Sequence, residues 1–156
     1  NGFAMDVLAY DPYIDQTTSI NSVKLLPRLE TLLEQCDFLS LHIPLTDETH
    51  NIINSERISI MKPGCHLINT SRGETVDLNA VSQSLNSGHL AGAAIDVFPQ
   101  EPPNLYQPIF KAHNTLLTPH IAGLSDRAIV QVATEAADGI IDVLQGKKPQ
   151  NEVPII

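Results

Sequence analysis

The chain has 156 residues, of which 42% are hydrophobic and 17% charged, a balance typical of a globular protein with a sizeable core. Its net charge is −9 and its nine basic residues are scattered, which argues against nucleic-acid binding. No apolar run reaches the roughly 20 residues that a membrane-spanning helix needs, so we expect no membrane partner.

The cysteines and histidines argue against structural cross-links and metals. Cys36 and Cys65 are too few for a disulfide framework and form no Cys-x-x-Cys pair, which favours a reducing, cytoplasmic setting. The six histidines lack the short spacing of zinc ligands, so no metal site is predicted. The absence of a Gly-x-Ser-x-Gly motif argues against a serine hydrolase.

The first part of the chain predicts strands separated by one helix. Residues 6–10 form a predicted strand that ends before Pro12, because proline cannot donate to a ladder. A short extended segment is predicted at 23–25. Residues 26–35 place leucines on one face and predict a helix, and residues 38–41 predict a buried strand.

The middle of the chain continues the alternation. Asn54 or Ser55 is the predicted N-cap of a short helix that ends before the following Lys-Pro-Gly. Residues 66–69 predict a strand that leads into a Ser-Arg-Gly turn. Residues 77–85 predict a helix, capped by its first aspartate and ended by Gly88.

The last part predicts two strands and a long helix. The strands are expected at 90–97 and 115–117, on either side of a proline-rich loop at 99–108. From Asp126 the chain predicts an amphipathic helix that Gly146 stops. Its apolar stripe is Ile129, Val132, Ala133, Ala136, Ile140 and Val143.

Strands that alternate with helices predict an α/β fold with a Rossmann-like, doubly wound parallel sheet. Such sheets bind ligands at the carboxyl ends of their strands. Candidate polar residues fall at the carboxyl ends of five predicted strands: Asp11, His42, Arg72, Asp96 and His120.

Arg72 lies between Ser71 and Gly73 in the predicted turn. A guanidinium suits a substrate carboxylate because it donates two parallel hydrogen bonds. Gly73 would let the backbone turn tightly. The alternative is a structural arginine without contact to a ligand.

His120 and Glu101 form a second candidate pair. A histidine can protonate the alkoxide that develops when a ketone accepts a hydride. Glu101 could hold this imidazole and favour its charged form. The alternative is that Glu101 is a solvated loop acid and His120 a turn histidine.

Asp11 closes a strand that corresponds to the second strand of a dinucleotide-binding unit. An acid there can accept hydrogen bonds from the adenosine ribose and repel a 2′-phosphate, which favours NAD over NADP. The alternative is that Asp11-Pro12 only starts a turn. No Gly-x-Gly-x-x-Gly loop precedes it in this sequence.

Seven segments together resemble the D-isomer-specific 2-hydroxyacid dehydrogenase family, in family order and with similar spacing. They are Val7-Leu-Ala-Tyr-Asp-Pro12, His42-Ile-Pro-Leu-Thr46, Met61-Lys-Pro-Gly64, Ile68-Asn-Thr-Ser-Arg-Gly73, Ala94-Ile-Asp-Val-Phe98, Glu101-Pro102 and Thr118-Pro-His-Ile-Ala-Gly123. The resemblance implies that Arg72 binds the substrate carboxylate and carbonyl. It also implies that His120 is the general acid/base and Glu101 its partner.

The resemblance further implies NAD as the cofactor. Asp11 would contact the adenosine ribose, and Asp96 the nicotinamide carboxamide. The remaining expected cofactor-binding residues are His42, Pro44, Thr70, Ser71 and Gly123.

The resemblance covers only the later part of the family's cofactor domain. Residues 1–150 would form a partial NAD-binding domain without its first strand and Gly-rich loop, and residues 151–156 would lead back to a substrate domain. The strands at 6–10 and 38–41 would then lack the neighbour that normally lies between them. We expect the chain to be a fragment of a longer enzyme, inactive alone.

The function implied is an oxidoreductase module that transfers a hydride between NAD(H) and a small D-2-hydroxy or 2-oxo acid. The full-length protein is expected to be a homodimer. Phosphoglycerate, glycerate, lactate and longer acids all stay open as substrates. The alternatives are an NAD-binding module that resembles the family's corepressors and recruits other proteins, or an inactive fragment.

Overall fold

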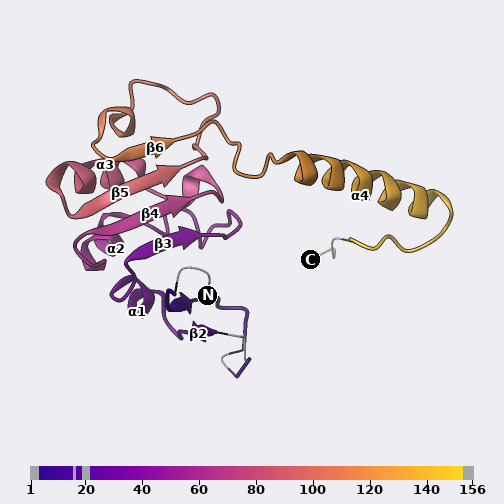
Figure 1. Ribbon diagram of the computed structural model, residues 1–156, viewed down its shortest axis with the longest axis horizontal. Helices are drawn as coiled ribbons and strands as arrows, with labels where there is room; N and C mark the ends of the chain where they lie inside the picture. The colour runs from indigo at the N-terminus through magenta and orange to yellow at the C-terminus, as the bar shows by residue number, and fades with distance from the viewer. Residues whose placement is uncertain (1–3, 16, 19–21, 153–156) are drawn as a thin grey trace. The chain divides into compact units, whose positions relative to one another are not determined.

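The computed structural model describes residues 4–15, 17–18 and 22–152. The chain forms two compact units, residues 1–120 and 121–156, which we describe separately (Figure 1). The first unit holds all the described strands and the second holds the longest helix.

The first unit is built on six parallel strands. They are β1 (Val7–Ala9), β2 (Val23–Leu25), β3 (Phe38–Leu41), β4 (Cys65–Asn69), β5 (Leu90–Ile95) and β6 (Thr115–Leu117). β1 pairs with β2, and the other four form one sheet in the order β3-β4-β5-β6. This is the predicted Rossmann-like α/β arrangement. β5 stops at Ile95 rather than at the predicted Val97, because its partners β4 and β6 end beside Ile95.

The two sheets are separate over the described residues. β1 pairs only with β2, and β3 pairs only with β4, so no ladder joins β1 to β3. The expectation that these two strands lack a common neighbour is therefore confirmed. Val7 on β1 and Phe38 on β3 stay 46% and 54% exposed.

Local signals account for most helix ends. α2 (Ser55–Ile60) is capped by Asn54, whose side chain accepts the Arg57 N–H at 3.0 Å. α3 (Leu78–Ser87) is capped by Asp77 and ends at Gly88, which adopts a φ of +78°. Both caps were predicted. Short 3₁₀ turns, η1 (Gly73–Thr75) and η2 (Pro108–Lys111), were not.

The predicted helix over 26–35 is shorter in the structure. Only α1 (Leu29–Leu33) is helical. Leu26 precedes Pro27, a position that disfavours helical backbone angles. Its N–H instead donates to the Ala9 carbonyl at 2.8 Å, in line with the β1–β2 ladder.

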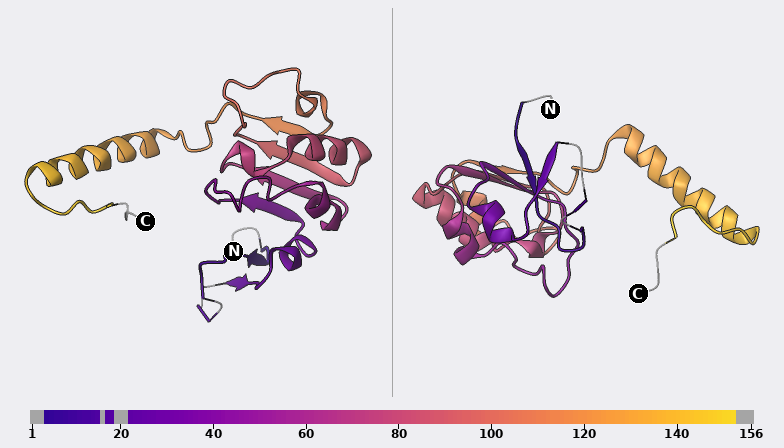
Figure 2. Two further views of the ribbon diagram at one scale, coloured as in Figure 1. Left: turned by 180° about the vertical axis from the view of Figure 1, so that it is seen from behind. Right: turned by 90° about the horizontal axis from the view of Figure 1, so that it is seen from below.

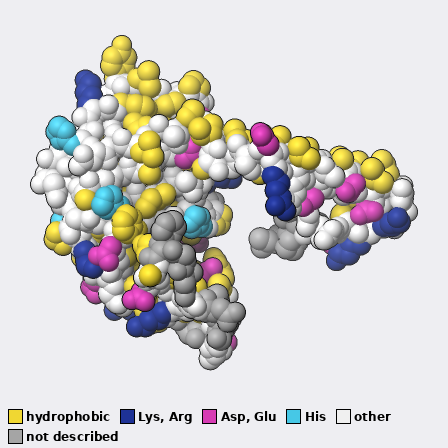
Figure 3. All heavy atoms as spheres, viewed as in Figure 1, with side chains coloured by type: hydrophobic (Ala, Val, Ile, Leu, Met, Phe, Trp, Pro, Cys, Tyr) yellow, Lys and Arg dark blue, Asp and Glu magenta, His cyan; other side chains and the backbone are white. Residues whose placement is uncertain are grey.

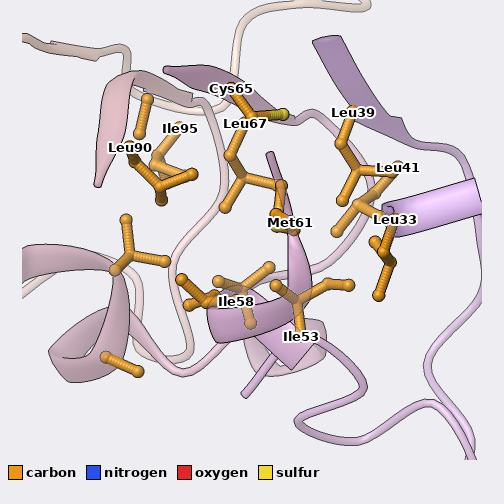
Figure 4. Packing of buried hydrophobic residues seen from close by; sticks show 14 of the residues in the cluster. Leu33, Leu39, Leu41, Ile53, Ile58, Met61, Cys65, Leu67, Leu90 and Ile95 are labelled. Carbon is orange, nitrogen blue, oxygen red and sulfur yellow. The ribbon is translucent and has the colours of Figure 1, made fainter. Parts of the chain in front are cut away.

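The core of the first unit lies on one face of the β3–β6 sheet (Figure 4). The strands lie in front of α2 and α3 in Figure 1 and behind them in the reverse view of Figure 2, so both helices cover this face. Leu33, Leu67 and Val81 have no exposed surface. Each such side chain contributes about 1.5–3 kcal/mol by leaving water. The buried face thereby holds the strand ends in register.

The opposite face of the sheet is open within the first unit. Phe38 stacks on His66 with ring centroids 4.9 Å apart, and Leu116 on β6 is 64% exposed. Apolar side chains gather over these strands in the space-filling view (Figure 3). Parallel sheets normally bury both faces, so an exposed apolar face is unusual for such a sheet.

The second unit consists mainly of α4 (Asp126–Leu144), which confirms the predicted long helix. Ser125 caps it by accepting the Ala128 N–H at 3.1 Å. Within this unit the predicted apolar stripe is not buried, with Val132 68% and Ile140 63% exposed. Among the described helices, none combines the length and apolar character that crossing a membrane requires.

Candidate active site

The turn after β4 is organised by Asn69, the last residue of that strand. Its side chain is fully buried. The side-chain carbonyl accepts the Ser71 N–H at 3.0 Å and the Ser71 hydroxyl at 2.9 Å. Its amide group donates to the Arg72 carbonyl at 2.9 Å and to the Thr75 hydroxyl at 3.3 Å. Asn69 thus sets the backbone of the whole Ser-Arg-Gly turn.

Gly73 allows this turn to touch the segment after β5. A Cβ atom added at Gly73 would lie 2.1 Å from the Phe98 carbonyl carbon and 2.3 Å from the Pro99 nitrogen. Both are backbone atoms, so no side-chain rotation would relieve the clash. Only glycine permits this approach, and it brings the Arg72 turn against the loop that carries Glu101.

The ends of β4, β5 and β6 are tied together through Asp96. The Asp96 N–H donates to the Asn69 carbonyl at 3.0 Å. The carbonyl of Asp96 accepts the His120 N–H at 2.8 Å, and its carboxylate accepts the Thr118 hydroxyl at 2.6 Å. Asp96 is only 4% exposed. His120, with a φ of +55°, is held by these bonds in a conformation that few non-glycine residues adopt.

Glu101 and His120 form a hydrogen-bonded pair. His120 Nδ1 lies 2.9 Å from Glu101 Oε2, and the other carboxylate oxygen accepts the Phe98 N–H at 3.1 Å. The bond from the imidazole, followed by that from Phe98, lowers the pKa of the Glu101 carboxyl. With a proton on Nδ1 directed at the carboxylate, the imidazole presents Nε2 to a ligand.

Arg72, Glu101 and His120 line one cavity of about 240 Å³. Arg72 is exposed, and one of its guanidinium nitrogens donates to the Ser71 carbonyl at 2.7 Å. The apolar side chains of the wall come from Val97, Phe98 and Pro99. The structure therefore brings together a cation and a carboxylate–imidazole pair, the three groups that the sequence predicted for this role.

The other predicted residues occupy different positions in the fold. Asp11 follows β1 and accepts the Tyr13 N–H at 2.9 Å, as in the turn that was the alternative for it. His42 Nε2 lies 2.9 Å from the Ser40 hydroxyl. The Pro44 carbonyl accepts the Thr49 hydroxyl at 2.7 Å.

Three further predicted residues are also located. Thr70 is exposed beside the Ser-Arg-Gly turn. Ser71 is buried, and its N–H and hydroxyl both donate to the Asn69 side chain. Gly123 belongs to the second unit. Within the described residues, no group of three or more acidic, histidine or cysteine side chains could hold a metal ion.

Asn69 and Thr118 were not predicted as part of the site. Both lie in segments that carry the family resemblance, Ile68–Gly73 and Thr118–Gly123. Asparagine is a common turn former, and its place at the end of a strand, one residue before Ser-Arg-Gly, could have marked Asn69. The bond from Thr118 to Asp96 joins residues 22 positions apart, so no local pattern indicates it.

Residues 1–122 match the family described as "D-isomer specific 2-hydroxyacid dehydrogenase, NAD binding domain". The chain belongs to this family. It is 42% identical over 154 residues to a glyoxylate reductase of Thermofilum pendens, covering 96% of this chain and 44% of that protein. It is 40% identical over 144 residues to a D-3-phosphoglycerate dehydrogenase of Dictyostelium discoideum, covering 90% of this chain and 35% of the relative.

Solved structures of the family have the same fold. A D-2-hydroxyisocaproate dehydrogenase superposes with a TM-score of 0.88 at 31% identity, covering 97% of this chain and 49% of that one. The chain thus spans less than half the length of these family members. Its match to them runs through the turn, loop and strand ends that surround the cavity.

Proposed function

We propose that this chain is the part of an NAD-dependent D-2-hydroxyacid dehydrogenase that carries the acid/base pair and the substrate arginine. The observation that supports this most is the cavity shared by Arg72, Glu101 and His120, with the imidazole 2.9 Å from the carboxylate. The reaction proposed is reversible hydride transfer between NAD(H) and a small D-2-hydroxy or 2-oxo acid.

The chain's polar groups suit a dinucleotide at the carboxyl ends of the strands. Asp11 offers a carboxylate after β1, and only one of its oxygens has a hydrogen bond, from Tyr13, among the described residues. A second oxygen is then available for ribose hydroxyls, and its charge disfavours a 2′-phosphate. The nicotinamide, when bound, supplies or accepts the hydride. We propose that the carboxamide of the nicotinamide lies beside Asp96.

His120 would hold the proton that the reaction moves. In the reducing direction, negative charge grows on the substrate's carbonyl oxygen, and Nε2 donates a proton to it. Glu101 fixes the orientation of the imidazole through Nδ1. General acid catalysis of this kind contributes about 10²–10⁴ in rate.

Arg72 would hold the substrate. A guanidinium has five N–H donors, and one is directed at the Ser71 carbonyl, so donors remain for a bidentate carboxylate contact. Because the turn is set by Asn69 and Gly73, the backbone from which this side chain extends is held in place. Fixed placement of the carboxylate beside His120 is the main contribution expected from Arg72.

We also propose a cytoplasmic location and a homodimer for the whole protein. The two buried free thiols suit a reducing compartment. The exposed apolar residues of α4 and of the open sheet face support burial against further protein.

The test uses the longer protein that contains these residues. It is assayed for NAD⁺ reduction with paired D- and L-2-hydroxy acids, wild type beside His120→Ala and Arg72→Ala. We expect turnover with D-acids only, a loss of at least 10²-fold in kcat for His120→Ala, and a raised KM for Arg72→Ala. NADH binding without turnover on any acid would instead favour a sensor of the corepressor kind.

A further inference from the structure

Two cysteines that are distant in sequence meet in the first unit. The Sγ atoms of Cys36 and Cys65 lie 4.0 Å apart although the residues are 29 positions apart. Cys36 follows α1 and stands two residues before β3, and Cys65 is the first residue of β4. The meeting point is therefore the amino-terminal edge of two adjacent parallel strands.

The surroundings suit closure of this gap. A disulfide requires an S–S distance of about 2.05 Å, so the sulfur atoms must approach by about 2 Å. Cys36 lies in a turn whose neighbours Gln35 and Asp37 are exposed. Movement of this turn, with small side-chain rotations, can supply the approach. Both cysteines belong to the core cluster, and Cys65, which starts β4 and is only 1% exposed, is expected to stay in place (Figure 4).

The two thiols are not equivalent. The contact with Cys65 is the main cause that lowers the pKa of Cys36, and the same contact together with burial raises the pKa of Cys65. Lys62 is kept beside this turn by an ion pair with Asp37. Both residues are buried, Cys36 at 8% and Cys65 at 1% exposed. One thiol is thus set to ionise first, and the other to respond.

We propose that Cys36 and Cys65 are a peroxide-sensitive dithiol, which a hydroperoxide converts into an intramolecular disulfide. The Cys36 thiolate attacks one peroxide oxygen. The O–O bond breaks, giving a sulfenic acid on Cys36 and releasing water or an alcohol. Cys65 then loses its proton and attacks the Cys36 sulfur, and the S–O bond breaks to release water. Two electrons pass from the thiols to the peroxide.

The cross-link would act on stability rather than on the cavity. It joins the amino-terminal ends of β3 and β4, whereas Arg72 follows the carboxyl end of β4. The closed loop of chain restricts the unfolded state and should raise the thermal midpoint of unfolding. The proposal does not depend on the reaction that the cavity performs.

The purified chain itself provides the test. It is treated with one equivalent of hydrogen peroxide, remaining thiols are alkylated, and tryptic peptides are mapped by mass. Cleavage after Arg28, Arg57 and Arg72 places Cys36 in peptide 29–57 and Cys65 in peptide 58–72, since the Lys62–Pro63 bond resists trypsin. We expect these two peptides to appear linked, two hydrogens lighter than their sum, and to separate again with dithiothreitol.

Single variants test the order of the steps. In Cys65→Ser, the sulfenic acid on Cys36 has no partner and should be trapped by dimedone; Cys36→Ser should give no trapped product. Dimedone on Cys65 in the latter variant would overturn the assignment of roles. The peptide map of the wild type tests the proposal without any substitution. Unchanged thiols, sulfinic acid or only intermolecular links in that map would overturn the proposal.

Discussion

Replacing Asn69 by alanine removes the side chain that sets the turn after β4. Four hydrogen bonds disappear: two accepted from Ser71, and two donated to the Arg72 carbonyl and the Thr75 hydroxyl. Each is worth about 0.5–1.5 kcal/mol net, which bounds the loss at about 2–6 kcal/mol. The Thr75 hydroxyl still donates to the Arg72 carbonyl at 2.6 Å, so that acceptor stays paired. We therefore expect a loss near the lower end, about 2–4 kcal/mol in the free energy of unfolding.

The assay for Asn69→Ala is urea unfolding followed by circular dichroism. Asn79→Ala is the matched control, because Asn79 is exposed near the start of α3 and should change stability by less than about 0.5 kcal/mol. In the longer enzyme, Asn69→Ala should also lower kcat/KM by about 10²-fold, since Arg72 loses its fixed placement. Equal unfolding midpoints for the two variants would show that the Asn69 side chain does not stabilise the turn.

Three further outcomes are expected. Gly73→Ala should lower the free energy of unfolding by about 1–3 kcal/mol, because the added Cβ would lie 2.1 Å from the Phe98 backbone. Gly64→Ala is the control for backbone strain alone, because Gly64 has a φ of +88° but open space around it. The pKa of Glu101 is lowered in the folded state, so the ionised carboxylate stabilises the fold fully above the ordinary carboxyl pKa of about 4.3, and this contribution disappears as the pH falls below it. The thermal midpoints of wild type and Glu101→Gln should therefore converge in acid. A constant difference down to low pH would contradict this cause. Asp11→Ser should raise the affinity for NADPH relative to NADH in the longer enzyme, measured by cofactor titration, and an unchanged ratio would remove Asp11 from the ribose site.

Much of the fold follows from local chemistry. Asn54 and Asp77 are caps that any reader of the sequence can place, because the bond each makes spans three residues. The presence of Arg72 and His120 in one cavity was also predictable, because both follow parallel strands whose carboxyl ends lie at the same edge of the sheet. The failure at Leu26 has an equally local cause, the proline that follows it.

The parts that sequence reasoning missed depend on contacts between distant segments. Gly73 was expected to ease a turn, but its main constraint is the backbone of Phe98, 25 positions later, which no local pattern reports. That contact arises only once the turn after β4 and the segment after β5 lie side by side. Asn69 is a different case, because its side chain bonds residues only two to six positions later, and its place before a turn could have marked it.

The central claim is that Arg72, Glu101 and His120 serve a hydride transfer. Its most direct test supplies the longer enzyme with NAD⁺ and a D-2-hydroxy acid deuterated at C2, then measures the mass of the NADH formed. We expect NADH heavier by one deuterium, formed from the D-acid, and a much lower rate of its formation in His120→Ala. Unlabelled NADH, or labelled NADH formed as fast by His120→Ala as by wild type, would contradict it.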